Sequence, residues 1–498
     1  MLTFIIGIIL LLVGGAIYGN FVEKILQPDD RKTPAVELAD GVDYVEMPKW
    51  KNMLIELLNI AGTGPVLGPI QGILFGPLAF ITIPIGCVIA GATHDFCNGF
   101  ISMRNKGAQM PRLIQKYLGK GTHSVYFIIM MVLMVLTGVV FIYTPGDLIV
   151  GELLRKDVGA GNSTIWIVYA VIFAYYLVAT LFPIDQIIGR IYPIFAGILI
   201  ISAVGVFGGI LLDGGKSLTN LSASTMPSMW HWSKQSFIPV FFITVACGIL
   251  SGFHGSQSTL ISRTVRTEKE GKATFYWMMI AEGFIAMCWA GGAMILYSRQ
   301  NDLLTSVNAT QMVGIISRTF LGNVGGILAI LGTIVLPITS GDTAFRSVRL
   351  MLAERLNISQ SDPKKRIGLT LVIFIPAIAI LAFSKLNAGG FSLLWRYFGF
   401  TNQLVAVFAL MMSTCYLLVH KKNFWITLIP GMFYTFIVTS FICHAPIGFG
   451  LESRLGLGAD SYLISYIIGA VVSVLVAWST VTYAKKHMSE IEQRVFNA

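Results

Sequence analysis

Charged residues are scarce in this sequence of 498 residues. Asp, Glu, Lys and Arg together make up 12% of the chain, whereas hydrophobic residues make up 55%. A soluble protein of this length could not cover so much apolar surface, so the composition excludes a soluble globular protein. Many stretches exceed about 18 apolar residues, which is enough to cross a hydrocarbon core of about 30 Å. The sequence therefore predicts an all-α polytopic membrane protein.

Paired cysteines and the common catalytic motifs are also absent. The six cysteines lie in or beside apolar stretches and form no CxxC pair, which argues against a disulfide framework and a zinc site. The sequence has no GxxxxGK(S/T), HExxH or GxSxG motif, and "GTGPVLG" lacks the GxGxxG spacing of a dinucleotide site. We therefore expect neither an enzyme nor a bound cofactor or metal. If the protein transports a solute, the lack of a P-loop predicts that an ion gradient supplies the energy.

Thirteen apolar stretches are predicted to be membrane-spanning helices. The first twenty residues lack the basic start and the A-x-A-like cleavage site of a signal peptide, so we expect them to be retained as a helix. The thirteen spans are predicted at residues 1–21, 52–75, 77–102, 123–148, 164–183, 188–212, 236–260, 272–297, 324–352, 366–384, 391–420, 424–443 and 461–485.

The positions of Lys and Arg predict the orientation of these spans. With the N-terminus outside, the cytoplasmic loops carry 26 of the 35 Lys and Arg residues, and the other side carries nine. Basic residues concentrate in the cytoplasmic loops of membrane proteins, so this distribution predicts an outer N-terminus and a cytoplasmic C-terminus. A missed pair of helices would leave the ratio nearly unchanged. The net charge of +10 therefore marks cytoplasmic loops and does not indicate a nucleic-acid partner.

One predicted span contains its own helix breakers. In "LLNIAGTGPVLGPIQGILFG", three glycines and two prolines fall within eight residues. Proline lacks the amide donor that a helix interior needs, and glycine weakens a helix by about 1 kcal/mol relative to alanine. Non-helical backbone at membrane depth costs several kcal/mol per unsatisfied group unless it lines a cavity or packs within protein. The break therefore predicts a substrate site formed by Gly62, Thr63, Gly64, Pro65 and Gly68.

A second break occurs in "FITVACGILSGFHGSQSTLISR", where glycines again interrupt an apolar run. Each break lies in the first span of a block of five predicted spans, at 52–212 and at 236–420. The two blocks start on opposite sides of the membrane, a pattern that is typical of an inverted repeat. Freed amides at such breaks favour an anion, and freed carbonyls favour a cation. The alternative is that the glycines only let helices pack closely. The second half of the predicted substrate site is Ser251, Gly252, His254, Gly255 and Ser256.

Ionisable residues within the apolar spans are candidates for ion coupling. An ionised group at the bilayer centre costs about 2.5–3.5 kcal/mol on insertion scales, so such groups usually face a cavity or a partner. His94 and Asp95 are adjacent and could carry a coupling proton, or they could form a structural pair near Arg104. Asp342 follows the interrupted stretch "LGTIVLPITSG" and could contact a cation or the substrate.

Three further acidic residues are harder to assign. Glu56 and Glu282 lie within apolar runs, where each is either a buried hydrogen-bonded residue or a coupling site. Asp185 lies near a predicted cytoplasmic turn, so a helix cap or a salt bridge to Arg190 is the simpler interpretation.

Five blocks of the sequence resemble one known family. The blocks "NIAGTGPVLGPIQG", "GATHDFCNGFISMRNKG", "PIDQIIGRIYPIFAGILI", "SGFHGSQSTLISR" and "GDTAFRSVRLMLAE" are similar, in matching order, to the carbon starvation protein A family. The resemblance implies a bacterial inner-membrane secondary transporter of the amino acid–polyamine–organocation superfamily, with a LeuT-like core of five plus five inverted helices. It also implies uptake of peptides or pyruvate, and discontinuous helices at 52–75 and 236–260.

The predicted organisation follows from the spans and the resemblance. We expect an N-terminal helix and loop, a first repeat, an outer loop, a second repeat, and two further helices with a cytoplasmic tail, at 1–51, 52–212, 213–235, 236–420 and 421–498. The predicted function is proton-coupled uptake of short peptides or small carboxylates by alternating access. A sodium-coupled carboxylate or amino-acid symporter is the first alternative, and a channel or a membrane sensor is the next. The sequence leaves open the substrate, the coupling ion and the oligomeric state.

Overall fold

The computed structural model describes the chain except residues 42–43, 180–183, 357, 359–361, 459–460 and 495–498, and describes only the backbone at 184–193 and 354. The described residues are predominantly helical and include no β-strand. Helix α1 (Leu2–Ile9) continues through a π-turn into α2 (Gly15–Leu26) and forms the first span. The prediction of an all-α polytopic membrane protein is confirmed.

The first half of the core follows the short helix α3 (Pro34–Glu37). Its elements are α4 (Lys49–Ile60), α5 (Gly64–Gly72), α6 (Ala79–Gly86), α7 (Ala92–Arg104), α8 (Met110–Leu148), α9 (Ser163–Ala179) and α10 (Ile184–Leu212). A π-segment joins α6 to α7, and another extends α8 to Leu153.

The second half of the core repeats this order of broken, continuous and long helices. Its elements are α11 (Phe242–Thr244), α12 (Ala246–Ile249), α13 (Gly252–Ile261), α14 (Trp277–Arg299), α15 (Leu303–Ser306), α16 (Ala309–Leu356), α17 (Pro363–Leu386) and α18 (Gly390–Val419). The chain ends with α19 (Trp425–His444), α20 (Leu451–Arg454), α21 (Leu463–Lys486) and α22 (Met488–Gln493).

The number of membrane crossings stays a prediction. Within the described residues, ten helices are long and apolar enough to span a membrane, or eleven when the bent pair α4–α5 counts as one span. The two other predicted spans are also helical. Helix α9 has 17 described residues, and the span at 236–260 is divided into short helices. Each predicted span therefore has a helical counterpart.

Two predicted spans correspond to the second part of a longer helical run, after a kink. The stretch at 123–148 belongs to a helix that begins at Met110, and the stretch at 324–352 to one that begins at Ala309. Both helices bend at a glycine with positive φ, Gly119 (φ 85°) and Gly322 (φ 66°), a conformation that glycine adopts without strain. Polar residues before each bend lowered the local hydropathy, so the sequence pattern did not predict these helical starts.

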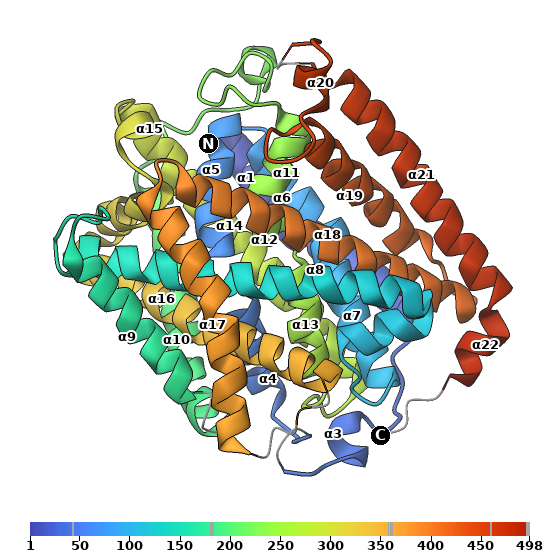
Figure 1. The fold of residues 1–498 in the computed structure, drawn as a ribbon. Coiled ribbons are helices and arrows are strands. Elements are labelled where there is room, and N and C mark those ends of the chain that lie inside the picture. The colour runs from blue at the N-terminus through green and yellow to red at the C-terminus, as the bar shows by residue number, and fades with distance from the viewer. Residues whose placement is uncertain (42–43, 180–183, 357, 359–361, 459–460, 495–498) are drawn as a thin grey trace.

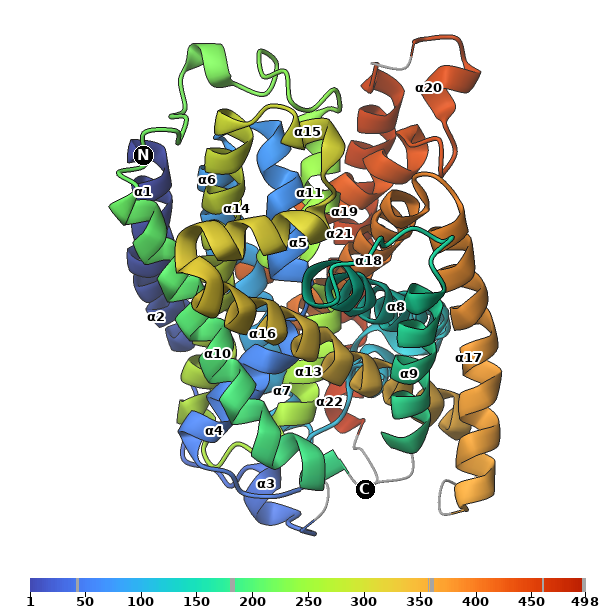
Figure 2. The ribbon, with the colours of Figure 1, turned by 90° about the vertical axis from the view of Figure 1, so that its left-hand side faces the viewer.

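The two halves run in opposite directions. Figure 2 shows α4 below α5, whereas α11 lies above α13. Figure 1 shows α8 crossing the middle of the molecule nearly horizontally, and it packs against α16, its counterpart in the second half. These directions agree with an inverted repeat.

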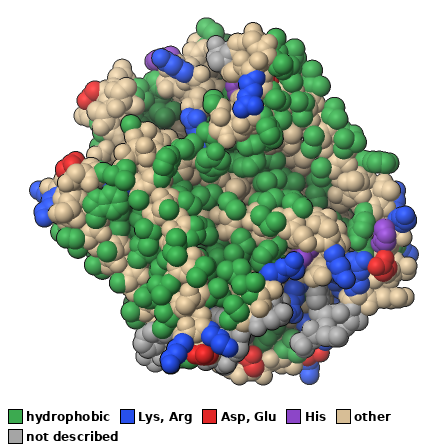
Figure 3. Space-filling view, in the orientation of Figure 1, with side chains coloured by type: hydrophobic (Ala, Val, Ile, Leu, Met, Phe, Trp, Pro, Cys, Tyr) green, Lys and Arg blue, Asp and Glu red, His purple; other side chains and the backbone are tan. Residues whose placement is uncertain are grey.

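The two ends of the molecule differ in charge. The start of α1 lies at the same end as α15 and α20, and α3 and α22 lie at the opposite end (Figure 2). Figure 3 shows a broad hydrophobic surface with Lys and Arg gathered at the α3 and α22 end. This end is the one that the positive-inside rule assigns to the cytoplasm.

Candidate functional site

The first break separates α4 from α5 and bends the chain by 50°. Hydrogen bonding within α4 stops at Ala61, whose amide donates to the carbonyl of Leu57, and resumes with the amides of Val66 and Leu67, which donate to Thr63. All residues from 61 to 70 are buried. The predicted break is therefore present and closed to the surface.

This break leaves backbone oxygens unpaired. Within the described part of the chain, no hydrogen bond reaches the carbonyls of Leu58, Asn59, Ala61 and Gly62. The hydroxyl of Thr63 is also buried without a partner there. Unpaired backbone oxygens at an unwound helix suit a cation or a hydrogen-bond donor of a substrate.

The second break separates α12 from α13. Leu250 and Ser251 are extended, with φ of −156° and −136°. Asn402 of α18 fills this break, because its side-chain oxygen accepts hydrogen bonds from the Phe253 amide at 2.9 Å and the Ser251 hydroxyl at 3.1 Å. Asn402 could not be selected from the sequence, since an amide side chain in an apolar helix belongs to no motif.

The two breaks lie against each other. A β-carbon added at Gly64 would lie 2.2 Å from the β-carbon of Cys247, and one at Gly68 would lie 3.1 Å from the Thr244 carbonyl oxygen. A β-carbon at Gly252 would lie 2.4 Å from the carbonyl oxygen of Asn402. These glycines therefore permit close helix packing as well as broken helices, so the two interpretations of the sequence are compatible.

A fully buried polar cluster lies beside the breaks. Asp95 of α7 accepts from both histidines: its carboxylate oxygens lie 2.7 Å from Nδ1 of His94 and 3.1 Å from Nδ1 of His254. The other ring nitrogen of His254 lies 3.5 Å from a carboxylate oxygen of Glu282 on α14. Each of these side chains has no exposed surface. His254 therefore lies between two acidic residues from two neighbouring helices.

Glu56 adds a third buried carboxylate. It lies in the last turns of α4 and accepts a hydrogen bond of 2.8 Å from the hydroxyl of Ser258 on α13. Its second oxygen, both oxygens of Glu282 and Nε2 of His94 have no hydrogen-bond partner among the described residues. We define Glu56, His94, Asp95, His254 and Glu282 as the buried cluster.

The charge of the buried cluster requires protons or a cation. Within the described part of the molecule, neither Lys nor Arg forms an ion pair with its three carboxylates. Several negative charges at zero exposure would each cost several kcal/mol, so the cluster is stable only when protons or a cation neutralise part of that charge. The described residues contain no group of three or more His, Cys, Asp or Glu side chains arranged to hold a metal ion.

Two further predicted residues, Asp342 and Ser256, are not part of the buried cluster and make other contacts. Asp342 of α16 pairs with Arg346 at 3.2 Å, one turn along the same helix. Ser256 is half-buried, and its carbonyl accepts from Thr259. The side chains of Asp185 and Arg190 lie outside the described residues, so their predicted pairing stays a prediction.

The sequence comparison identifies the family. The model described as "Carbon starvation protein CstA" matches residues 1–210, 151–317 and 304–441. The chain belongs to this family. Relatives include an uncharacterized membrane protein of Haemophilus influenzae, 38% identical over 62% of this chain and 95% of that protein. The peptide transporter CstA of Escherichia coli is 25% identical over 84% of this chain and 77% of its own length. The pyruvate/proton symporter BtsT of Escherichia coli is 25% identical over 55% of this chain and 46% of its own length.

Solved transporter structures share the fold. A manganese transporter of Eremococcus coleocola aligns with a TM-score of 0.53 and 13% identity, over 92% of this chain and 99% of that chain. A Na⁺-coupled sialic acid symporter aligns with a TM-score of 0.52 and 15% identity, over 96% and 97%. The CstA-family chain is thus a multi-pass inner-membrane protein with a LeuT-like fold, and its relatives include a named peptide transporter and a named pyruvate/proton symporter. That the named relatives are transporters supports the expectation that this chain is not an enzyme.

Proposed function

We propose that this protein is a proton-coupled secondary transporter that imports small carboxylates or short peptides by alternating access. The observation that carries the proposal is the buried cluster beside the two breaks. His254 lies in the first turn of α13, directly after the second break, and Glu56 lies one turn before the first break. Solute binding at the breaks and proton occupancy of the cluster would therefore affect the same half-helices.

The proposed repeats are residues 52–212 and 236–420, with the N-terminus outside and the C-terminus in the cytoplasm. The opposite directions of α4–α5 and α11–α13 support this division (Figure 2). The substrate classes rest on the relatives, one named as a peptide transporter and another as a pyruvate/proton symporter. The energy is sufficient: one charge moving through 100 mV supplies about 2.3 kcal/mol, which allows roughly 50-fold accumulation.

Sodium coupling is the second candidate. The unpaired carbonyls at Leu58, Asn59, Ala61 and Gly62 are hard oxygen ligands, which suit an alkali cation better than a proton. These oxygens and the buried cluster are separate features, so each ion can be tested alone.

The decisive experiment is uptake into sealed liposomes. The purified protein is reconstituted, and accumulation of labelled pyruvate and of a labelled dipeptide is measured with an inward proton gradient, with an inward sodium gradient, and with neither. Accumulation that requires only the proton gradient supports the proposal and names the substrate class. Accumulation that requires only sodium supports the second candidate. Equilibration without accumulation under both gradients would indicate a channel and contradict both proposals.

A further inference from the structure

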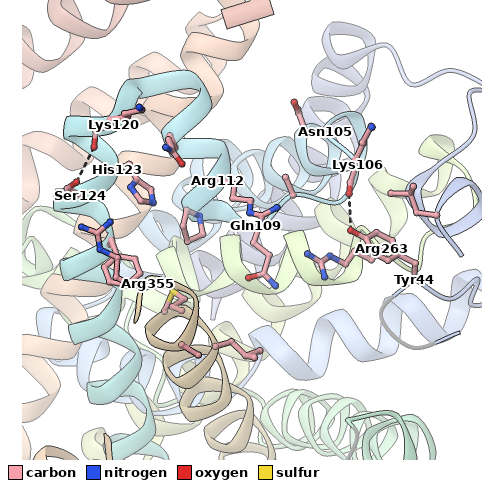
Figure 4. Close-up of a pocket in the computed structure, with 18 of the residues that line it drawn as sticks. Tyr44, Asn105, Lys106, Gln109, Arg112, Lys120, His123, Ser124, Arg263 and Arg355 are labelled. Carbon is pink, nitrogen blue, oxygen red and sulfur yellow. Dashed lines mark hydrogen bonds between the residues drawn. The ribbon is translucent and has the colours of Figure 1, made fainter. Parts of the chain in front are cut away.

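A basic pocket lies apart from the breaks, at the end of the molecule that is rich in Lys and Arg. It has a volume of about 1070 Å³ and lies between the start of α8, the end of α16 and the residues Leu38, Asp40 and Tyr44. Figure 4 shows His123 and Arg355 on one side of this pocket, and Lys106 and Arg263 on the other. None of its lining residues belongs to the buried cluster or to the two breaks.

The lining is strongly positive. Five basic residues and one histidine face a single acidic residue, Asp40, among the lining residues; the basic set is Lys106, Arg112, Lys120, Arg263 and Arg355, with His123. Of these, Lys106, Lys120 and Arg355 are exposed and form no ion pair among the described residues. Like charges held close together repel one another, so this lining favours a bound anion.

Part of the lining is already fixed in place. The guanidinium of Arg263 donates to the Gly107 carbonyl at 2.9 Å and lies 5.0 Å from the centre of the Tyr44 ring. The hydroxyl of Tyr44 donates to the Lys106 carbonyl at 3.1 Å. Gln109 is the N-cap of α8, so the positive end of that helix adds to the basic lining. An anion would therefore meet a partly ordered set of donors.

The pocket borders an exposed apolar surface. Its wall includes Phe127 and Leu350, and Leu350 is 43% exposed. On the same stretch of α8, Val125 and Ile128 are 52% and 64% exposed. Figure 3 shows Lys and Arg side chains at the lower edge of this face, directly below hydrophobic surface. A ligand with a phosphate and acyl chains fits this boundary better than a free soluble anion.

We propose that this pocket binds the phosphate of an anionic phospholipid from the adjacent leaflet, with the acyl chains along α8. Basic pockets between helices on the cytoplasmic side of membrane proteins recognise such headgroups. The proposal is independent of the transported substrate, because no residue at the breaks takes part in it.

The test is a lipid titration of the purified full-length protein, with bound lipid counted by native mass spectrometry. The probes are phosphatidylglycerol, phosphatidylcholine and inorganic phosphate. The pocket variant is Lys120→Gln with Arg355→Gln, and the matched control is Lys485→Gln with Lys486→Gln, which removes the same charge from exposed residues at the end of α21. Both variants alter exposed side chains, and size-exclusion chromatography checks that each stays folded.

We expect the wild type to bind phosphatidylglycerol in preference to phosphatidylcholine. A basic residue near anionic lipid contributes about 1 kcal/mol, so two of them correspond to roughly 30-fold in affinity. The pocket variant should lose about this much, and the control less than threefold. Lys106→Gln, from a separate loop, should lose about fivefold. Equal losses in the pocket and control variants would overturn the proposal. Binding of inorganic phosphate at the pocket without preference for phosphatidylglycerol would also overturn it, in favour of a soluble anion.

Discussion

Replacing Asp95 by Asn tests whether the buried cluster holds the coupling proton. The change preserves the shape of the side chain and removes one negative charge. The Asp95 carboxylate lies 3.1 Å from Nδ1 of His254 and would attract a positive charge held in the cluster. At an effective dielectric constant of about 20, that attraction is about 5 kcal/mol, most of which the cost of burial offsets. A remainder of about 1.4 kcal/mol corresponds to a factor of about ten in the affinity of the cluster for that charge.

The expected result is a shift in the pH dependence of uptake. Because the variant cluster holds a proton less tightly, half-maximal uptake into liposomes should require an external pH lower by about one unit or more. Initial rates are measured from pH 5 to pH 8 at a fixed membrane potential. Asp342→Asn is the comparison, because that carboxylate pairs with Arg346 on α16 instead of joining the buried cluster.

Two outcomes would refute this reasoning. An Asp95→Asn protein that transports with the wild-type pH profile would show that Asp95 has only a structural role. A shift in Asp342→Asn with none in Asp95→Asn would move the coupling site to α16. Thermal unfolding of both proteins in detergent separates these results from simple misfolding.

Three further predictions concern packing and charge. Gly64→Ala should lower the unfolding temperature and the uptake rate, because its β-carbon would lie 2.2 Å from that of Cys247 and overpacking costs about 1–3 kcal/mol. Cys247→Gly in the same protein should restore both quantities. If it restores neither, the contact between Gly64 and Cys247 is not the cause of the loss. Lys385→Met should destabilise the protein by about 3–5 kcal/mol, because it removes the cation that lies 2.7 Å from the buried carboxylate of Asp147. Thermal unfolding measures this loss, and the double variant Lys385→Met with Asp147→Asn should recover most of it. Burial of Glu452 would raise the pKa of its carboxyl, but hydrogen bonds from the start of α21 outweigh it and lower that pKa below the ordinary value. The ionised Glu452 therefore stabilises the fold fully above the ordinary pKa of about 4.3, and this contribution is lost as pH falls through the folded-state pKa. The stability of Glu452→Gln should fall less than that of the wild type over this acid range. Identical stability–pH profiles of the two proteins would contradict the assignment.

The broken helices could be predicted from sequence because their cause is local. Glycine and proline disfavour a helix wherever they stand, and the first break lies at Gly62 to Gly64, as that rule predicts. The extended starts of α8 and α16 could not be predicted, because they depend on tertiary packing. Leu113 and Tyr117 are buried against other helices although Lys116 and Lys120 interrupt the apolar run. A hydropathy average over such a segment combines its buried and exposed residues, so it does not reveal that one face of the helix is buried.

The buried cluster shows the same limit. His94, Asp95 and His254 could be selected from the sequence because they are ionisable residues beside breaks or one another. Glu56 and Glu282 could also be recognised in the sequence as ionisable residues within apolar runs. Only the fold shows that Glu56 lies near Ser258 and Glu282 near His254. Residues separated by up to 226 positions meet when four helices pack together, and a single sequence does not specify which buried acids share a neighbour.

The placement of His254 indicates how proton and solute binding would be coupled. The Phe253 amide is capped by Asn402, and the next residue lies between Asp95 and Glu282. A movement of α13 that opened the second break would therefore alter the His254 contacts in the same step. Because coupling between two bound species is reciprocal, a proton that stabilises these contacts must also change the affinity of the break for its solute. The charge imbalance of the cluster makes that coupling strong, since loss of the His254 contacts would leave two carboxylates at zero exposure without their shared partner.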